Sequence, residues 1–305
     1  MKKNFILPLL IALAFVGLDT TPANASFISN YKAKVTLNRE IKNARKDVKD
    51  VFVKQDLYTN SHDLKKLEEL YSNNFANSDG IKKELYFKLI KDTWLSYPEI
   101  SYNTIIRDIQ IDGDYATVQT YEMALATTHE QDENLDAYGE LRSVASSIYH
   151  LKKYGEKWLI FSEQILSEQS QLKYGDARFT KMELSAPQLI HANDEYTALL
   201  MIDLDKNENA IASIDKQLIT YPLEKPKEAF RNLSERNELE RIFKGNNNNI
   251  HEYATASVGI SRIEPYEGKL SKVYISGIAF LITRINVIPE NKLIKNEDNN
   301  AQEVK

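Results

Sequence analysis

The hydrophobic pattern along the chain changes its period near Pro98. Before this residue, apolar side chains recur at helical spacing on three segments, which begin near Glu40, Ser61 and Ile81. Proline disfavours continuation of a helix, and after Pro98 apolar and polar residues alternate with a period of two. The pattern therefore predicts three helices over residues 40–97, followed by strands.

Two β-hairpins are predicted directly after these helices. The first pairs ISYNTIIRDIQI with YATVQTYEMALATT through a DGD turn, and the second pairs LRSVASSIYHL with WLIFSEQILSE through KKYGEK. The acidic stretch HEQDENLDAYGE between the hairpins is predicted to be a flexible loop. A twisted sheet bends around helices packed on one face, so we expect the hairpins to form the wall of a cone filled by the helices.

The segments IDGDYATV and YGEKWLI, placed after the helices, resemble the nuclear transport factor 2-like (NTF2-like) superfamily, close to its SnoaL-like members. The resemblance covers residues about 40–170. It implies a cone-shaped α+β domain with a cavity. Members include isomerases, dehydratases, cyclases, transport adaptors and proteins without catalysis, so the resemblance implies a shape rather than an activity.

The second half of the chain has a different pattern. Five strand-like runs, rich in β-branched residues, occur between residues 177 and 289, interrupted by the helix-like stretch KEAFRNLSERNELERIF with Gly245 as its expected C-cap. The predicted fold class is therefore α+β, with an NTF2-like cone over residues 40–172 and an all-β, immunoglobulin-like sandwich over residues 173–290. Residues 291–305 are polar, and we expect a disordered tail there.

The first residues have the pattern of a cleavable signal peptide. MKK is a positive start, FILPLLIALAFVGL is an apolar run too short to span a bilayer comfortably, and Ala23-Asn24-Ala25 fits a cleavage site. We expect a signal peptide over residues 1–25 with cleavage after Ala25, a linker over residues 26–39, and no transmembrane anchor after cleavage. The expected destination is the periplasm or the exterior of a bacterial cell.

Composition removes several classes of function. The chain has no Cys, which excludes thiol catalysis and thiolate-bound metals, and its net charge of −5 argues against nucleic-acid binding. None of the five His has metal-ligand spacing, and no nucleotide-binding or hydrolase motif occurs. We therefore expect no metal, no cofactor and no catalytic residue.

The concave face of the predicted sheet provides the candidate binding site. If Ala116 and Val118 face inward, the period of two also turns Glu122 inward, and the same counting from Trp158 turns Ser162 and Gln164 inward. A β-bulge that reverses this facing, or loop contacts that cover the polar positions, is the alternative. His150 falls on the opposite face. The candidate ligand-binding residues are Trp94, Glu122, Ser147, Tyr149, Ser162 and Gln164.

These residues suggest a non-catalytic binding or interaction protein of the bacterial envelope, with the cavity taking a small amphiphilic molecule or a peptide segment. One alternative is a SnoaL-like isomerase or dehydratase acting on a hydrophobic carbonyl compound, although a lone Glu without His makes an incomplete active site. Another is a structural protein that docks to an envelope partner through the β-sandwich. A homodimer is compatible with each of these functions.

Overall fold

The structure is a computed structural model that describes the backbone of residues 23–266 and 270–290, and side chains over residues 34–264 and 271–290. The expected signal-peptide residues 1–22 and the expected tail 291–305 lie outside the described residues. The chain divides into two units, Met1–Ala44 and Arg45–Lys305. The boundary falls inside helix α1 (Ala23–Asn60), and the packing contacts, the sheets and the cavity described below belong to the second unit.

Helix α1 begins earlier than the sequence pattern predicts and includes the expected linker, residues 26–39. The second predicted helix is only partly helical. Helix α2 (Leu64–Glu68) is short. Its N-cap residue is Asp63, whose carboxylate accepts a hydrogen bond from the Lys66 backbone N–H at 3.1 Å. Strand β1 (Tyr71–Asn77) then replaces the predicted second half of that helix. Helix α3 (Lys83–Ser96) ends two residues before Pro98.

Four long antiparallel strands follow the helices, as the change of period predicts. The DGD segment connects the first two strands, and the acidic stretch forms longer strand ends with a short turn rather than a flexible loop. Strand β1 pairs in parallel with the last of the four. The four strands are β2 (Ser101–Asp112), β3 (Tyr115–Asp132), β4 (Ala137–Tyr154) and β5 (Lys157–Gly175).

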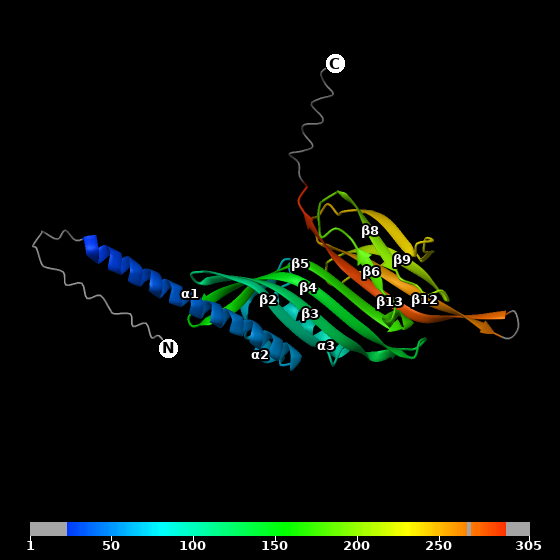
Figure 1. Cartoon of the computed structure of the whole chain (residues 1–305), viewed down its shortest axis with the longest axis horizontal. Coiled ribbons are helices and arrows are strands. Elements are labelled where there is room, and N and C mark those ends of the chain that lie inside the picture. The colour runs from blue at the N-terminus through cyan, green and yellow to red at the C-terminus, as the bar shows by residue number, and fades with distance from the viewer. Residues whose placement is uncertain (1–22, 267–269, 291–305) are drawn as a thin grey trace, which may run out of the picture. The chain divides into compact units, whose positions relative to one another are not determined.

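The helices pack on one face of this sheet. Phe52 of α1 and Tyr149 of β4 are both buried, and their rings meet edge to face with centroids 5.3 Å apart. Asp56 of α1 accepts hydrogen bonds from the backbone N–H and the hydroxyl of Thr104, on edge strand β2. Trp158, which begins the last strand, is also buried. Figure 1 shows the C-terminal part of α1, with α2 and α3, beside strands β2–β5.

The second half continues the same sheet. Its elements are a 3-10 turn (Asp176–Arg178), β6 (Met182–Ser185), β7 (Leu189–His191), β8 (Glu195–Ile202), β9 (Glu208–Leu218), β10 (Arg231–Asn232), β11 (Glu238–Lys244), β12 (Glu252–Tyr266) and β13 (Leu270–Ile288). Strand β13 pairs with β5, so the strands run β10-β9-β12-β13-β5-β4-β3-β2 in one large sheet (Figure 1). A small sheet of order β11-β8-β6 packs over β9, β12 and β13 around a common apolar core.

The predicted fold class is therefore wrong. The described residues are mostly strand, and the two halves share one antiparallel sheet instead of forming a cone followed by an independent immunoglobulin-like sandwich. The helix predicted over residues 227–243 is also absent. Its last part is β11, which pairs along its whole length with β8 and packs the half-buried Leu239 and Phe243 against the apolar core, so tertiary pairing overrides the helical propensity.

The junction between β5 and β13 is built on two facing glycines, Gly175 and Gly277. A Cβ on Gly277 would lie 2.4 Å from the backbone nitrogen of Ala177, and one on Gly175 would lie 2.3 Å from the Ser276 carbonyl oxygen. Gly175 also has a positive φ of 56°. The chain turns out of β5 here, and only residues without side chains let the two strands meet.

We expect Gly277→Ala to destabilise the protein by about 1–3 kcal/mol, because the added methyl group overlaps backbone atoms that cannot move independently. The matched control is Gly259→Ala on β12, where the new Cβ would meet the Ile211 side chain at an ordinary 3.6 Å. The measurement is the urea midpoint of unfolding followed by intrinsic fluorescence. Equal midpoints for the two variants would contradict this account of the junction.

Candidate functional site

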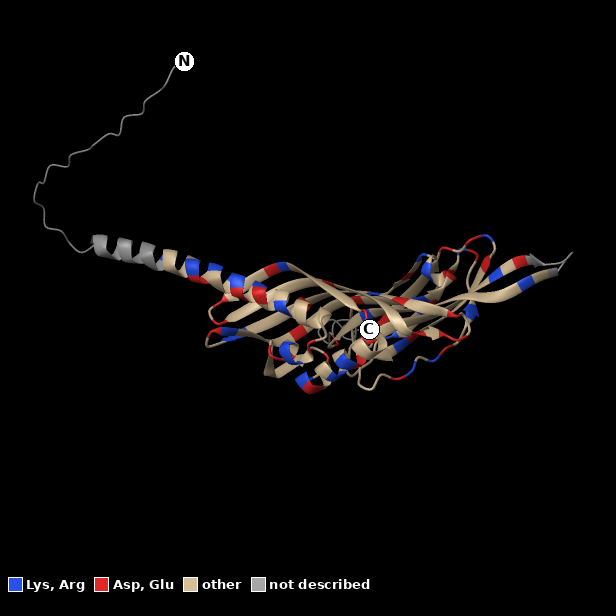
Figure 2. Ribbon diagram, turned by 90° about the horizontal axis from the view of Figure 1, so that it is seen from below, with Lys and Arg blue, Asp and Glu red and all other residues tan. Residues whose placement is uncertain are grey.

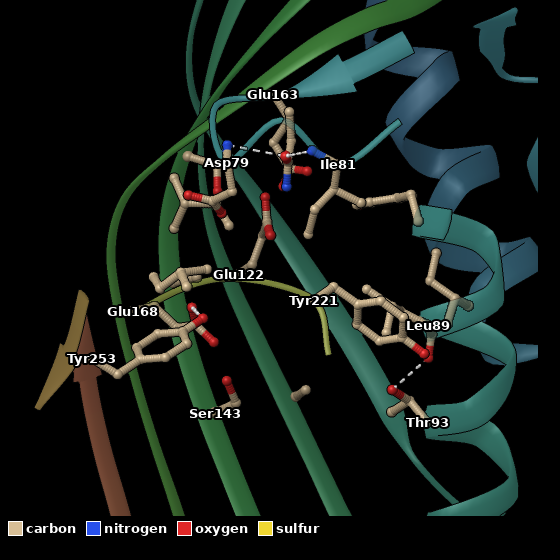
Figure 3. A pocket seen from close by; sticks show the side chains of 18 of the residues that line it. Asp79, Ile81, Leu89, Thr93, Glu122, Ser143, Glu163, Glu168, Tyr221 and Tyr253 are labelled. Carbon is tan, nitrogen blue, oxygen red and sulfur yellow. Dashed lines mark hydrogen bonds between the residues drawn. The ribbon is translucent and has the colours of Figure 1, made fainter. Parts of the chain in front are cut away.

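A cavity with mostly apolar walls and a volume of about 520 Å³ lies between α3 and the sheet. Leu89 and Ile90 of α3 line one wall, and Ile165 of β5 lines the opposite one. The segment after β9 contributes Ile219 and Leu223, so residues from both halves of the chain surround the space. Figure 3 shows this arrangement, with Tyr221 near Leu89.

Three carboxyl groups line the polar part of the cavity: Glu122 of β3, and Glu163 and Glu168 of β5. In Figure 3 the Glu122 side chain points toward Glu163, while Glu168 lies beside Tyr253. The side chain of Glu163 is almost fully buried, with 4% of its surface exposed. The cavity thus combines apolar walls with an acidic floor.

Each of these carboxyl groups accepts one hydrogen bond from a protein hydroxyl. Glu122 Oε1 accepts from Thr120 Oγ1 at 2.7 Å. Glu163 Oε1 accepts from the Tyr149 hydroxyl at 2.9 Å, and Glu168 Oε2 accepts from the Tyr253 hydroxyl at 2.8 Å. These bonds fix the orientation of the carboxyl groups and leave the second oxygen of each directed elsewhere.

Burial changes the acidity of all three groups. Removal from water, followed by repulsion from Glu122, raises the pKa of Glu163 to about 8. Burial also raises the pKa values of Glu122 and Glu168 above their ordinary range, and the hydroxyl donors oppose this shift. At neutral pH the Glu163 carboxyl group is therefore mostly protonated in the unliganded protein.

Two polar atoms in this region have no hydrogen-bond partner among the described residues. They are Glu163 Oε2 and Ser147 Oγ, and both belong to residues that line the cavity. Ser147 has only 1% of its surface exposed. Because a buried polar atom without a partner is costly, these atoms mark a place that a ligand's polar group can complete.

A buried ion pair lies at the edge of the acidic region. Arg284 of β13 contacts both carboxylate oxygens of Asp79, which lies in the segment between β1 and α3 and lines the cavity. The Arg284 guanidinium also donates to Asn286 Oδ1 at 2.9 Å. The arginine is thus held by its own partners, and no Lys or Arg occurs among the described residues that line the cavity.

Two β-bulges in β5 determine which of its side chains reach the cavity. Opposite β4, His150 pairs with Ser162 and Leu151 with Ile160, which leaves Phe161 as an extra residue. Ser146 pairs with Ser167 and Ser147 with Ile165, which leaves Leu166 as a second extra residue. The first bulge turns Glu163 inward, and the second turns Glu168 inward.

The structure places the predicted site residues in three different surroundings. Glu122 and Ser147 line the cavity, and Tyr149 lies behind it, bonded to Glu163. Trp94 is buried and stacks on His62 with ring centroids 4.5 Å apart, outside the cavity lining. Ser162 and Gln164 lie on the other face of β5, because the first bulge reverses the alternation on which their placement was based.

The sequence prediction missed Glu163, Glu168 and Tyr253. A signal for the two glutamates does exist in the sequence. The doublets Ile160-Phe161 and Ile165-Leu166 interrupt the alternation of apolar and polar residues at the two bulges. Tyr253 had no such signal, because its approach to Glu168 depends on the pairing of β13 with both β5 and β12.

The described residues show no group of three or more acidic or His side chains with the geometry of a metal site. Acidic and basic residues are interspersed along the described part of the chain, as Figure 2 shows. Among the same residues, no helix combines the length and the apolar composition needed to cross a membrane.

Comparisons with known proteins give structural neighbours only. No family model matches the chain, and no curated protein matches it. Among solved structures, one of Bd1075 from Bdellovibrio bacteriovorus is similar over 40% of this chain and 39% of that chain, with 15% identity and a TM-score of 0.33. The aligned part is thus well under half of that neighbour.

Two further neighbours align over most of their own length. Hexachlorocyclohexane dehydrochlorinase LinA-type3 from Novosphingobium barchaimii aligns over 43% of this chain and 88% of that chain, with 12% identity and a TM-score of 0.34. A candidate dehydratase of the NTF2-like family from Streptomyces avermitilis aligns over 41% and 96%, with 11% identity and a TM-score of 0.33. The name of the second neighbour contains the superfamily that residues about 40–170 resemble.

The raised pKa of Glu163 predicts how stability depends on pH. The folded protein holds a proton on this group between about pH 4.5 and pH 8, whereas the unfolded chain releases it there. The stabilisation present at low pH is therefore lost as the pH rises toward 8, by at most about 1.4 kcal/mol per pH unit for one proton. We expect the slope of unfolding free energy against pH to be smaller in Glu163→Gln. Parallel curves for the two proteins from pH 5 to 8 would contradict the assignment.

Proposed function

We propose that this chain is a binding protein whose cavity takes a small amphiphilic molecule without transforming it. The observation that carries the proposal is the acidic floor beneath apolar walls, with Glu163 Oε2 and Ser147 Oγ left without partners inside the fold. A volume of about 520 Å³ lies within the range of small-molecule sites. The apolar part of the ligand would contact Leu89, Ile90 and Ile165, and its polar group would contact the carboxyl groups.

A purely structural role receives less support from this geometry. A fold that only docks to a partner gains from a filled interior, since a cavity forfeits packing contacts and reduces stability. Here the space between α3 and the sheet is retained, and polar groups are turned toward it by two bulges. The same observations favour a small ligand over a peptide segment, because the cavity is lined on several sides by α3, the sheet and the segment after β9.

The alternative of an isomerase or dehydratase acting on a hydrophobic carbonyl compound is favoured by one observation. Glu122 and Glu163 face the same space, and Glu122 is close enough to raise the pKa of Glu163, as neighbouring acid–base groups in an active site do. No His lines the cavity among the described residues, and Glu163 is bonded to Tyr149. We therefore place binding first.

We also propose that the protein works outside the cytoplasm, in the periplasm or at the cell exterior, and interacts with the bacterial envelope. The support is the sequence of residues 1–25, which has the charge, apolar run and small-residue site of a cleavable signal peptide. The absence of Cys agrees with a protein whose stability in such a compartment does not depend on disulfides.

The first test measures whether the cavity binds an apolar molecule. We expect N-phenyl-1-naphthylamine, a neutral dye whose fluorescence rises in apolar surroundings, to bind the protein at micromolar concentration. Ala124 lines the cavity, so Ala124→Phe fills part of the space and should weaken binding of the dye at least tenfold. Leu125→Phe is the matched control, because Leu125 is 44% exposed and points to the other face of β3. An equal dye affinity in the two variants would contradict binding in this cavity.

The second test separates binding from catalysis. An enzyme that moves a proton beside a carbonyl group should exchange the α-protons of 2-octanone for deuterium in D₂O, as measured by NMR. We expect the native protein to exchange these protons no faster than the Glu122→Gln variant does. Glutamine keeps the shape of the side chain but cannot act as a base. Exchange that requires the native protein and disappears in this variant would favour the enzyme alternative.

A further inference from the structure

The carboxyl groups of the acidic floor are oriented by hydrogen bonds that they accept from the protein. Glu122, Glu163 and Glu168 each receive a bond from a protein hydroxyl, which favours the ionised form of a carboxyl group. Burial and mutual repulsion act in the opposite direction, and no cation among the described lining residues resolves the conflict. The lining thus holds three glutamate carboxyl groups without a cation beside them among the described residues, and in the unliganded protein Glu163 keeps its proton.

The nearest positive side chain is already used. Arg284 approaches from β13, but both carboxylate oxygens of Asp79 contact it, and its side chain is completely buried. On α3, Lys88 Nζ donates to the Tyr221 hydroxyl at 2.9 Å and does not line the cavity. The other ionisable side chains around the acidic floor are Asp56, Asp79 and tyrosines, none of which carries positive charge; the tyrosines include Tyr71, Tyr86, Tyr149 and Tyr253. A neutralising charge must therefore come from the ligand.

We infer that the polar group of the ligand is an organic ammonium ion, bound between Glu163 Oε2, Ser147 Oγ and the carboxylate of Glu122. This inference rests on the proposed binding function and adds the charge of the ligand to it. An ammonium group has up to three N–H donors, and Glu163 Oε2 and Ser147 Oγ are buried acceptors without partners. The apolar walls suit an alkyl or aryl chain attached to that group.

A metal ion fits this floor less well than an organic cation. The three carboxyl groups belong to two strands and are bonded to three separate hydroxyls, and the described residues show no convergent group of metal-binding side chains. A neutral carbonyl ligand has no N–H or O–H donor for Glu163 Oε2 or for the Glu122 carboxylate, and it brings no charge that compensates for the acidic side chains. An anionic head group would add to that repulsion.

Binding of an ammonium ion should release a proton. In the unliganded protein, burial keeps Glu163 protonated at neutral pH, and a bound cation lowers its pKa because opposite charges attract. The groups that face Glu163 include Glu122 of β3, Tyr149 of β4, Tyr86 of α3 and Asp79 before α3, and Asp79 keeps its own partner, Arg284. Ionisation of Glu163 is therefore the change that a ligand's charge most directly drives.

The test compares three eight-carbon probes that differ only in the head group. Octylamine, octanol and octanoate are titrated at pH 7 against protein with bound N-phenyl-1-naphthylamine, and displacement of the dye is measured. We expect octylamine to displace the dye at a concentration at least tenfold lower than either of the others. Displacement by octanol or octanoate at an equal or lower concentration than octylamine would overturn the inference, and so would no displacement by any of the three. In either case, binding of the dye itself would still support the cavity as a binding site.

Two variants test the role of Glu163. Glu163→Gln should weaken octylamine at least tenfold and leave octanol unchanged, whereas Glu130→Gln, which removes an exposed charge from β3, should change neither. Thermal unfolding followed by circular dichroism checks that both variants fold. If Glu163→Gln does not fold, Glu122→Gln is measured by the same criterion. Unchanged octylamine affinity in the folded Glu163 variant would overturn the assignment of this residue.

Calorimetry supplies a readout that loss of packing alone does not produce. Octylamine is titrated at pH 7 in phosphate and in MOPS buffer, which contains no primary amine and has a different ionisation enthalpy, so the heat difference reports the protons exchanged. We expect release of a proton in the native protein and a smaller release in Glu163→Gln. Binding without proton release in the native protein would overturn the assignment of Glu163 as the counter-ion. Absence of dye binding in the first place would overturn the proposed function and this inference together.

Discussion

The pairing of β5 with β13 is the interaction on which the rest of this structure depends. It runs from Gln169–Thr283 to Gly175–Gly277 and ends at two glycines that let the strands meet without side chains between them. This pairing joins strands from the first and second halves into one sheet. It also brings Tyr253 of β12 to Glu168 and Arg284 to Asp79, so the acidic region depends on the same junction.

The second determinant is the irregularity of β5. A regular strand after Ile160 would turn Ser162 and Gln164 toward the helices in place of Glu163. The extra residue Phe161 instead turns Glu163 inward, and the extra residue Leu166 restores the original alternation, so that Glu168 faces inward as well. A buried carboxyl group lowers stability unless something compensates for it. Two such groups on one strand, Glu163 and Glu168, are therefore better explained by the proposed binding role than by packing.

The sequence allowed prediction of the features that depend on local pattern. The change from helical to strand period at Pro98, the hairpins after it and the inward facing of Glu122 and Ser147 follow from regular alternation along single strands. Features that depend on partners far along the chain could not be predicted in this way. The segment at residues 238–244 has helical composition but becomes β11 because β8 offers it a pairing edge. Likewise, nothing local shows that β13 would join β5.

The loop after β9 has a consequence for how this protein can be divided or rearranged. Ile219, Thr220, Tyr221 and Leu223 complete the wall of a space whose floor was made about 50 to 100 positions earlier in the chain. A fragment that ended after β5 would keep its helices and its glutamates yet would open that space to water on one side. The segment that resembles a familiar small fold therefore does not enclose the cavity by itself; the later part of the chain is needed to complete its wall.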